Sequence, residues 1–400
     1  MDSLQTFLDK PRSGKPRICL VTSIFHGFGK IGGFGTMAKS LAMVLVDNGY
    51  DVVVAVPRRA GQAEVTEVRG FTVLGLTMAQ MVNPRIYARI DADLYHSQSP
   101  NLMSVAAKLG KRDARHVITC RDPRTLGDWV IEIRDATWRR KIRNVALMMF
   151  EEGPLVTWAI RRADCVAYAA RFLQEKITRM YRPRVPLTFL PNIEGIPEEI
   201  PQKADTPTAC FVGRFDRRKR PELYIDLARK VPEVTFLMVG CAEDAAWQRT
   251  LEEMAEPVEN LKLLGYIDKF DDDEFYDVYD SSWVFVNTAS REAHPLTFFE
   301  ASGRGCAILS YVNPDDFASE FGYWAENEDF ASGMRELIAN DAWRERGARA
   351  HEYVREHYRY DVAARTHLDL YSKLLDQATQ RGHVELKSGE SSEVRERNES

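Results

Sequence analysis

The stretch Asn287-Thr-Ala-Ser-Arg-Glu-Ala-His-Pro-Leu-Thr-Phe-Phe-Glu300 decides how this chain is interpreted. It follows an apolar run, 283–286, which predicts a buried strand. It continues into a segment, 296–303, which predicts a helix beginning near Pro295. Proline is tolerated at a first helical position because its missing N–H has no partner there in any case. The stretch is therefore expected to turn from the end of a strand into the start of a helix.

The start of this helix offers two kinds of ligand group. The amides of Leu296, Thr297 and Phe298 are expected to point out of the first turn, where an anionic group is favoured. Two carboxylates flank them, Glu292 in the loop and Glu300 about one turn in, with seven residues between the two. Carboxylates repel phosphate, so hydroxyl groups are their expected partners. Phosphate at the amides and hydroxyls at the carboxylates together suit a sugar nucleotide.

This pair of glutamates resembles the signature of the retaining family-4 glycosyltransferases of the GT-B fold. The resemblance implies that Glu292 lies against the transferred sugar and that Glu300 binds the ribose of the nucleotide. Family members usually have Glu-Gly-Phe-Pro or Glu-Gly-Phe-Gly here, whereas this chain has Glu-Ala-His-Pro. His294 is thus expected among the donor-binding residues, with altered contacts to the sugar. On its own, the spacing also fits a solvated helix edge.

Bulk composition places the chain among cytosolic globular proteins. Its 400 residues suffice for two domains, and 44% hydrophobic with 28% charged residues is typical of such proteins. A net charge of −5 argues against a nucleic-acid partner. The six cysteines are scattered without a C-x-x-C pair, and neither a signal peptide nor an apolar run of about 18 residues is found. A cytoplasmic protein is expected, either free in the cytoplasm or bound at the cytoplasmic membrane face.

A glycine-rich loop follows the first predicted strand, 17–23, and precedes a predicted helix, 36–48. Such a loop either lets the backbone approach a phosphate or is simply flexible, and spacing alone favours neither. Gly32-Gly-Phe-Gly35 also resembles the first loop of the same glycosyltransferase family, which lies near donor phosphate and acceptor. The resemblance implies a donor contact at Gly33 and acceptor-side contacts at Gly32 and Gly35.

Further strands alternate with helices, which predicts a parallel sheet covered on both faces. Ligands bind at the carboxyl ends of such strands, here at residues 96–100 and 121–123. The family commonly has His-x-His at the first position. In this chain Gln98 takes the place of the second His and is expected to hold the donor sugar. His96 is assigned to the acceptor side, although a lone His there is more often structural, and Arg121 joins it where the family has His-Asp.

An amphipathic helix is predicted over 135–150. Trp138, Ile142, Val145 and Met149 form a narrow apolar stripe, and basic residues cover the other faces. A helix of this kind can lie on anionic lipid. The favoured alternative is a stripe that packs on its own domain.

The second half of the chain repeats the strand–helix alternation after a predicted linker, 197–207. A strand near 210–214 is followed by a basic loop, in which the resemblance implies that Arg214 and Lys219 grip the donor diphosphate. These cations would stabilise the leaving nucleotide without a metal ion, and no cofactor is expected. Ile267 ends a later strand at the position where the family binds the base, mostly through its backbone.

The predicted fold class is α/β with the GT-B architecture, which consists of two doubly wound Rossmann-like domains facing a cleft. The predicted parts are an acceptor-side domain (1–196), the linker, a nucleotide-sugar domain (208–360), a crossover helix (361–382) and a disordered tail (383–400). The expected reaction is transfer of a UDP- or GDP-linked sugar to a glycan, lipid or small-molecule acceptor, with retention of configuration. The alternatives are a sugar-nucleotide epimerase and a non-catalytic nucleotide-sugar-binding protein.

Overall fold

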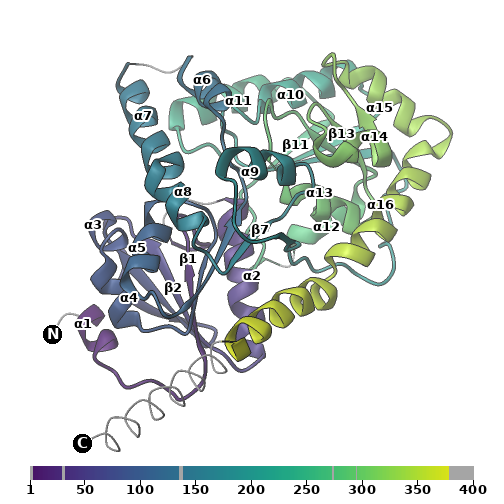
Figure 1. The fold of residues 1–400 in the computed structure, drawn as a ribbon. Coiled ribbons are helices and arrows are strands. Elements are labelled where there is room, and N and C mark those ends of the chain that lie inside the picture. The colour runs from purple at the N-terminus through teal and green to yellow at the C-terminus, as the bar shows by residue number, and fades with distance from the viewer. Residues whose placement is uncertain (1–2, 29–31, 135–137, 273, 294, 378–400) are drawn as a thin grey trace, which may run out of the picture. The chain divides into compact units, whose positions relative to one another are not determined.

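The computed structural model describes residues 3–28, 32–134, 138–272, 274–293 and 295–377. The chain divides into two compact units, one built from 1–190 with the C-terminal part from 364, the other from 191–363 (Figure 1). Each unit is an α/β structure around its own sheet, which confirms the two doubly wound domains expected from the alternating pattern. Within the described residues, no helix combines the length and the apolar character needed to cross a bilayer.

The first unit is built on an eight-stranded sheet with the order β3-β4-β2-β1-β5-β6-β7-β8. Only β3 runs antiparallel to its neighbour. The central strands are buried along their whole length, as expected for parallel strands covered on both faces. The strands are β1 (Arg17–Val21), β2 (Asp51–Pro57), β3 (Val65–Val68), β4 (Phe71–Leu76), β5 (Leu94–Ser97), β6 (Arg115–Cys120), β7 (Cys165–Tyr168) and β8 (Leu187–Phe189).

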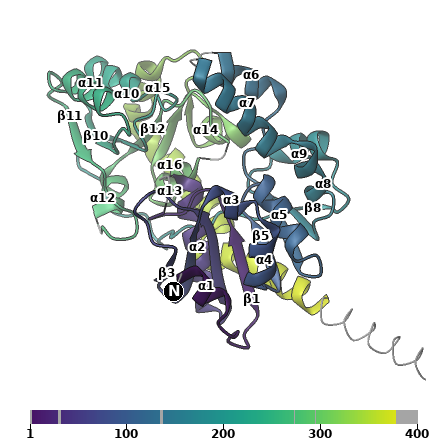
Figure 2. The same ribbon diagram turned by 90° about the vertical axis from the view of Figure 1, so that its left-hand side faces the viewer.

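Helices cover both faces of this sheet, and local sequence determines where several of them begin (Figure 2). Asn101, for example, accepts hydrogen bonds from the amides of Met103 and Ser104, so that α5 starts at Leu102. The helices are α1 (Ser3–Leu8), α2 (Gly33–Asp47), α3 (Met78–Met81), α4 (Pro84–Ile90), α5 (Leu102–Gly110), α6 (Leu126–Arg134), α7 (Trp138–Glu152), α8 (Pro154–Ile160) and α9 (Leu173–Tyr181).

The second unit is built on a six-stranded, fully parallel sheet with the order β11-β10-β9-β12-β13-β14. Its strands are β9 (Thr208–Val212), β10 (Thr235–Val239), β11 (Leu261–Gly265), β12 (Val284–Asn287), β13 (Ala307–Ser310) and β14 (Gly322–Trp324). Its α-helices are α10 (Pro221–Lys230), α11 (Ala245–Ala255), α12 (Glu274–Ser281), α13 (Leu296–Gly303), α14 (Phe317–Phe321), α15 (Phe330–Ile338) and α16 (Ala342–Tyr358).

The segment expected to be a linker is part of the second unit. The division falls at 190/191, whereas the sequence had suggested 196, and residues 197–207 carry neither helix nor strand. They are nevertheless anchored, because Lys203 Nζ donates to the carbonyl of Tyr279 at 2.9 Å and Trp283 Nε1 donates to the carbonyl of Ala204 at 2.7 Å. These bonds hold the segment against the body of the unit.

The last helical segment, 360–377, passes from the second unit into the first, to which its residues belong from 364 onward. Tyr371 is fully buried there and is hydrogen-bonded to His96 of β5. The predicted end of the crossover helix, 378–382, and the predicted tail, 383–400, lie outside the described residues.

Helix α7 differs from the favoured expectation. Its apolar stripe was expected to pack on its own domain, but Ile142, Val145 and Met149 are 60%, 46% and 54% exposed. Asn144, on another face of the helix, is buried. The prediction of an inward-facing stripe is therefore wrong for these three residues, because α7 packs through a different face; the side chain of Trp138 lies outside the described part.

Candidate functional site

Two loops of the second unit lie side by side because they follow neighbouring strands. Strands β9 and β12 are paired and parallel, so the loops after them, 213–220 and 288–295, leave the same edge of the sheet. Backbone and side chain then join the loops. The amide of Ser290 donates to the carbonyl of Arg218 at 2.9 Å, and Thr288 Oγ1 donates to the carbonyl of Lys219 at 2.7 Å. The fold thus brings together two segments that sequence analysis had assigned to one ligand.

The loops also meet through an ion pair between two predicted ligand residues. Lys219 Nζ is bonded to Glu292 Oε1, and the two side chains are only 17% and 11% exposed. The amide of Lys219 donates to Asp216 Oδ1 at 3.1 Å, which holds the loop in a tight turn. The predicted diphosphate cation and the predicted sugar carboxylate therefore share one location.

Arg214 lies in the same loop but is more open to solvent. Its Nη2 is 3.1 Å from Asp216 Oδ2, and both side chains are about one-third exposed, at 35% and 36%. An ion pair this exposed contributes little energy, so the guanidinium can exchange Asp216 for an anionic ligand at small cost. Asp216 was not among the predicted residues, although its position between the two cations, two residues after Arg214, is visible in the sequence.

The start of α13 is close to the predicted one. Pro295 precedes the first helical residue, Leu296, and has extended backbone angles, so it is an N-cap and not the first helical residue as expected. The amide of Phe298 donates to the carbonyl of Pro295 at 3.1 Å, which removes it from the predicted free donors. The amides of Leu296 and Thr297 donate no hydrogen bond within the described part of the chain. His294 lies outside that part.

Glu300, the second predicted carboxylate, is held inside the unit with 4% exposure. Its Oε1 accepts a hydrogen bond from Lys269 Nζ at 2.7 Å, and its Oε2 accepts one from the Tyr279 hydroxyl at 2.9 Å. The carboxylate is therefore fixed in orientation before any ligand binds. Neither Lys269 nor Tyr279 was predicted from the sequence.

Lys269 also binds a second buried carboxylate, Glu194. Its Nζ lies 2.7 Å from each oxygen of Glu194, and the Tyr276 hydroxyl donates to Glu194 Oε1 at 2.9 Å. Burial would lower the pKa of Lys269, but the two carboxylates outweigh burial and raise it. Burial raises the pKa of Glu194, and Lys269 opposes that change. Lys269 is thus a buried cation shared by two acids.

Ile267, the predicted base contact, lies just before Lys269 in the loop that follows β11. The Lys269–Glu300 bond consequently ties the predicted base-binding loop to the predicted ribose-binding carboxylate. The amide of Gly240 donates to the carbonyl of Gly265 at 2.7 Å and fixes the start of the same loop. The loop that carries the predicted base contact, Ile267, is therefore attached to α13, which carries the predicted ribose contact, Glu300.

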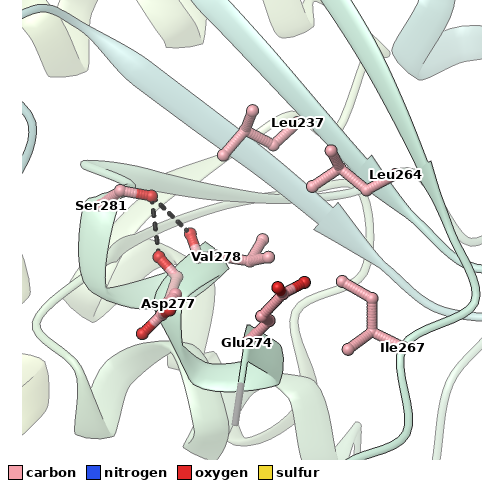
Figure 3. A pocket seen from close by; sticks show the side chains of 7 residues that line it. All are labelled: Leu237, Leu264, Ile267, Glu274, Asp277, Val278 and Ser281. Carbon is pink, nitrogen blue, oxygen red and sulfur yellow. Dashed lines mark hydrogen bonds between the residues drawn. The ribbon is translucent and has the colours of Figure 1, made fainter. Parts of the chain in front are cut away.

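A hollow of about 350 Å³ lies between the edge of the sheet and α12 (Figure 3). Of the predicted donor residues it includes Ile267, but neither Lys219 nor Glu300 lines it. Two of its lining residues, Glu274 and Asp277, are acidic and would repel a diphosphate. We therefore do not place the diphosphate in this hollow. Its lining consists of Leu237, Leu264, Ile267, Glu274, Asp277, Val278 and Ser281.

In the first unit, the predicted loop glycines differ in their surroundings. Gly33 is the first residue of α2, and Gly32 is its N-cap with open space where a side chain would be. Gly35 is packed, because a Cβ there would lie 2.9 Å from the amide nitrogen of His26. Gly35 thus has a structural reason to be glycine, whereas Gly32 leaves room for a ligand.

His96 is part of the interior of the first unit. It is 0% exposed, its Nδ1 is bonded to the Tyr371 hydroxyl, and its Nε2 lies 2.7 Å from Thr119 Oγ1. Burial lowers its pKa well below the usual value, with His367 and Arg121 acting in the same direction. Both ring nitrogens are hydrogen-bonded within the unit, so we do not retain His96 as an acceptor-side ligand. The alternative from the sequence, a histidine with a structural role, agrees with these contacts.

Gln98 and Arg121 are brought together because they follow adjacent strands, β5 and β6. Arg121 Nη2 donates to Gln98 Oε1 at 2.9 Å, and both side chains are buried. Burial lowers the pKa of Arg121 to about 10. The side-chain nitrogen Nε2 of Gln98 has no hydrogen-bond partner among the described residues. A buried donor without a partner is costly, which marks Gln98 as a place where a ligand oxygen would be favourable.

Two family models match the chain, one after the other. Residues 32–193 match the glycosyl transferase 4-like domain, and residues 192–357 match glycosyl transferases group 1. The point where the matches meet lies close to the division between the two units. No curated protein sequence matches the chain.

Solved structures share the fold at low sequence identity. Sucrose-phosphate synthase from Thermosynechococcus elongatus has a TM-score of 0.70 and 19% identity, covering 91% of this chain and 100% of its own. Alr3699/HepE from Anabaena in complex with UDP-glucose has 0.63 and 13%, covering 89% and 99%. The catalytic domain of starch synthase IV from Arabidopsis thaliana bound to ADP and acarbose has 0.58 and 11%, covering 91% and 100%.

Proposed function

The chain belongs to the group 1 glycosyltransferases of GT-B fold, and on that premise we propose that it transfers a sugar from a nucleotide-diphosphate donor with retention of anomeric configuration. The observation that carries this proposal is the largely buried ion pair between Lys219 and Glu292. The two residues lie in the loops that follow the neighbouring parallel strands β9 and β12. The pair unites a cation suited to a diphosphate with a carboxylate suited to sugar hydroxyls. A solvated helix edge would not bring these two charges together.

The donor is proposed to bind the second unit. Arg214 and Lys219 would hold the diphosphate, with the amides of Leu296 and Thr297 at the start of α13 as further donors. Glu300 would accept from the ribose and Ile267 would face the base. When the donor binds, Lys219 is expected to exchange part of its contact with Glu292 for phosphate oxygens, which leaves Glu292 free to accept from sugar hydroxyls.

In the proposed reaction the acceptor oxygen bonds to the anomeric carbon on the same face from which the diphosphate oxygen leaves. The acceptor proton passes to the departing phosphate, so no protein base is required. Arg214 and Lys219 would stabilise the charge that grows on the leaving group, by about 2.7–4 kcal/mol per donor if they act as other preorganised donors do. This role replaces that of a metal ion, and activity is therefore proposed to persist in EDTA.

Uridine is the first base to test, because the fold relative Alr3699/HepE was solved with UDP-glucose and with UDP. Calorimetry of the purified full chain with UDP, GDP, ADP and their common sugar conjugates is the direct experiment. One nucleotide–sugar pair that binds clearly, followed by NMR assignment of the product anomer, would support the proposal. Hydrolysis or isomerisation without any acceptor would favour the epimerase. Binding without turnover would favour a nucleotide-sugar-binding protein, and no binding would exclude the donor site.

The acceptor is proposed to lie at an anionic membrane surface, reached through α7. This proposal is supported by the exposure of Ile142, Val145 and Met149 on one stripe of a helix whose sequence also carries Lys141 and three arginines. Exposed apolar residues flanked by cations suit the interface between acyl chains and anionic headgroups. A lipid-linked acceptor would be presented at such a surface.

Vesicle sedimentation tests the membrane contact. The full chain is expected to sediment with vesicles rich in phosphatidylglycerol and to stay in solution with phosphatidylcholine alone. Replacing Ile142 and Met149 by Glu should abolish sedimentation, whereas Met78→Glu, at a residue of α3 that is 50% exposed, should not. Equal sedimentation of all three proteins would contradict this part of the proposal.

A further inference from the structure

We propose that Lys269 is a positioning residue for the donor ribose, because it holds the carboxylate of Glu300 in the orientation that accepts from the two ribose hydroxyls. The proposal rests on the function proposed above and adds a residue that neither the sequence pattern nor the family match assigns. Lys269 does not itself touch the nucleotide in this scheme. Its role is to fix the orientation of the Glu300 carboxylate through a hydrogen bond to Oε1.

The hydrogen-bond donors of Lys269 are taken up by carboxylate oxygens of Glu194 and Glu300. An ammonium group has three N–H donors. Its Nζ lies 2.7 Å from Glu194 Oε1, from Glu194 Oε2 and from Glu300 Oε1, so that three carboxylate oxygens surround it. Its side chain is 11% exposed, and those of Glu194 and Glu300 are 1% and 4% exposed. A diphosphate that replaced these partners would leave two carboxylates buried without a cation.

Glu300 retains acceptor capacity in this arrangement. An ionised carboxylate has about four lone-pair directions on its two oxygens. Lys269 occupies one direction at Oε1, and the Tyr279 hydroxyl occupies one at Oε2. About one direction on each oxygen is left, and the two hydroxyls of a ribose are spaced to donate to a single carboxylate in this way. The carboxylate is thus oriented by Lys269 and Tyr279 and keeps lone-pair directions that these two donors do not occupy.

Charge explains why a lysine is needed at this place. Glu194 and Glu300 are both buried, and two carboxylate charges at one buried site repel each other unless a cation lies between them. Lys269 supplies one positive charge between the two acids, and the hydroxyls of Tyr276 and Tyr279 donate to them in addition.

A purely structural role is the competing explanation, because the network also anchors the segment just after the division at 190/191. The amide of Glu194 donates to the carbonyl of Tyr358 at 3.2 Å, next to the point where the chain leaves the second unit again. A structural tie would affect stability and all ligands alike. The positioning role concerns the ribose hydroxyls alone, so the two explanations differ in a measurable way.

The test compares the affinity of UDP with that of 2′,3′-dideoxy-UDP, by calorimetry on the full chain; if another nucleoside diphosphate binds best in the screen, it and its dideoxy form are used. The wild type is expected to prefer the ribose form by about tenfold or more, since the dideoxy form lacks both hydroxyls that would donate to the Glu300 carboxylate. Lys269→Met should reduce this preference to less than threefold while changing the affinity for the dideoxy form little. Glu300→Gln should give a similar loss, and the double variant should add little to either.

A matched control is Lys203→Met, which removes another partly buried lysine of the same unit that contacts Tyr279 only through its backbone. It should keep the preference of the wild type. If Lys269→Met does not fold, Lys269→Gln, which retains a neutral donor, decides in the same way. An unchanged ribose preference in the Lys269 variants, or an equal loss for both ligands, overturns the positioning role while the proposed function stands. A wild type that binds no nucleoside diphosphate overturns both.

Discussion

The carboxyl ends of the strands in the two units carry polar residues of different character. In the second unit, the predicted residues lie in ion pairs: Lys219 pairs with Glu292, which was also predicted, and Glu300 pairs with Lys269, which was not. In the first unit, His96 is enclosed by the neutral hydroxyls of Tyr371 and Thr119. Ion pairs between loops keep charges in place that a ligand can later use. In the neutral buried network the donors and acceptors of His96 are bonded to Tyr371 and Thr119, so they stabilise the unit and are not available to a ligand.

The largest expected effect is that of Lys219→Ala in the second unit. The variant removes a cation from the proposed diphosphate site and leaves Glu292 to repel the ligand. A decrease in kcat/KM of about 100- to 1000-fold is expected, equivalent to about 3–4 kcal/mol. Steady-state kinetics with the donor found in the nucleotide screen would measure it. Lys230→Ala, at the exposed end of α10, is the control and should retain wild-type kinetics.

Glu152 in the first unit is a buried acid that, unlike Glu292 and Glu300, has no lysine partner among its hydrogen bonds to the described residues, and its protonation makes the stability of the protein depend on pH. Burial raises its pKa from 4.5 to about 7, although the Tyr181 hydroxyl and the amide of Arg124 donate to it. The folded state therefore holds a proton that the unfolded state loses between pH 4.5 and 7, so stability falls as pH rises through this range. At pH 8 the cost is roughly 3 kcal/mol.

Glu152→Gln removes this titration. Chemical unfolding at pH 5 and at pH 8 should show the variant close to the wild type at the lower pH and more stable than it at the higher pH. Glu175→Gln, at an exposed residue of α9, should match the wild type at both values. A constant difference between wild type and Glu152→Gln at the two pH values would contradict the assignment.

His96→Ala tests the opposite side of the comparison. The variant leaves the hydroxyls of Tyr371 and Thr119 buried without their partner, at a cost of about 2–3 kcal/mol in unfolding free energy. Nucleotide affinity is expected to remain that of the wild type. Calorimetry and urea unfolding of the same preparation measure both quantities. A variant with normal stability and lost activity would return His96 to the candidate site.

The smallest expected effect distinguishes the two loop glycines. In Gly35→Ala the new methyl group would meet Ile24 and the backbone of residues 25 and 26 at 2.9–3.0 Å, so a loss of about 1–2 kcal/mol in stability is expected. The new methyl group of Gly32→Ala meets no atom of the described residues within 4 Å, so the variant should leave stability unchanged. Thermal unfolding of the two variants checks the pair. If Gly32→Ala alone lowers activity, a ligand contact at that position is supported.

Much of the fold could be predicted because its signals are local. Apolar runs such as 51–56 and 116–120 are strands with nearly the predicted bounds, since a parallel strand covered on both faces needs continuous apolar sequence. The turn from β12 into α13 was also predicted closely, because Pro295 limits where the helix can begin. The direction in which α7 buries its side chains was not predictable, since it depends on the neighbours that the helix meets.

The sequence by itself determined the strand–helix alternation, the basic loop after β9 and the two glutamates around the start of α13, because periodicity, proline and charge act over a few residues. Only the tertiary structure decided which charges pair. Lys219 and Glu292 are 73 residues apart, and Lys269 and Glu194 are 75 apart. The Lys219–Glu292 pair forms because parallel strands place distant loops at one edge of a sheet, and that neighbourhood is a property of strand order, which no short stretch of sequence contains.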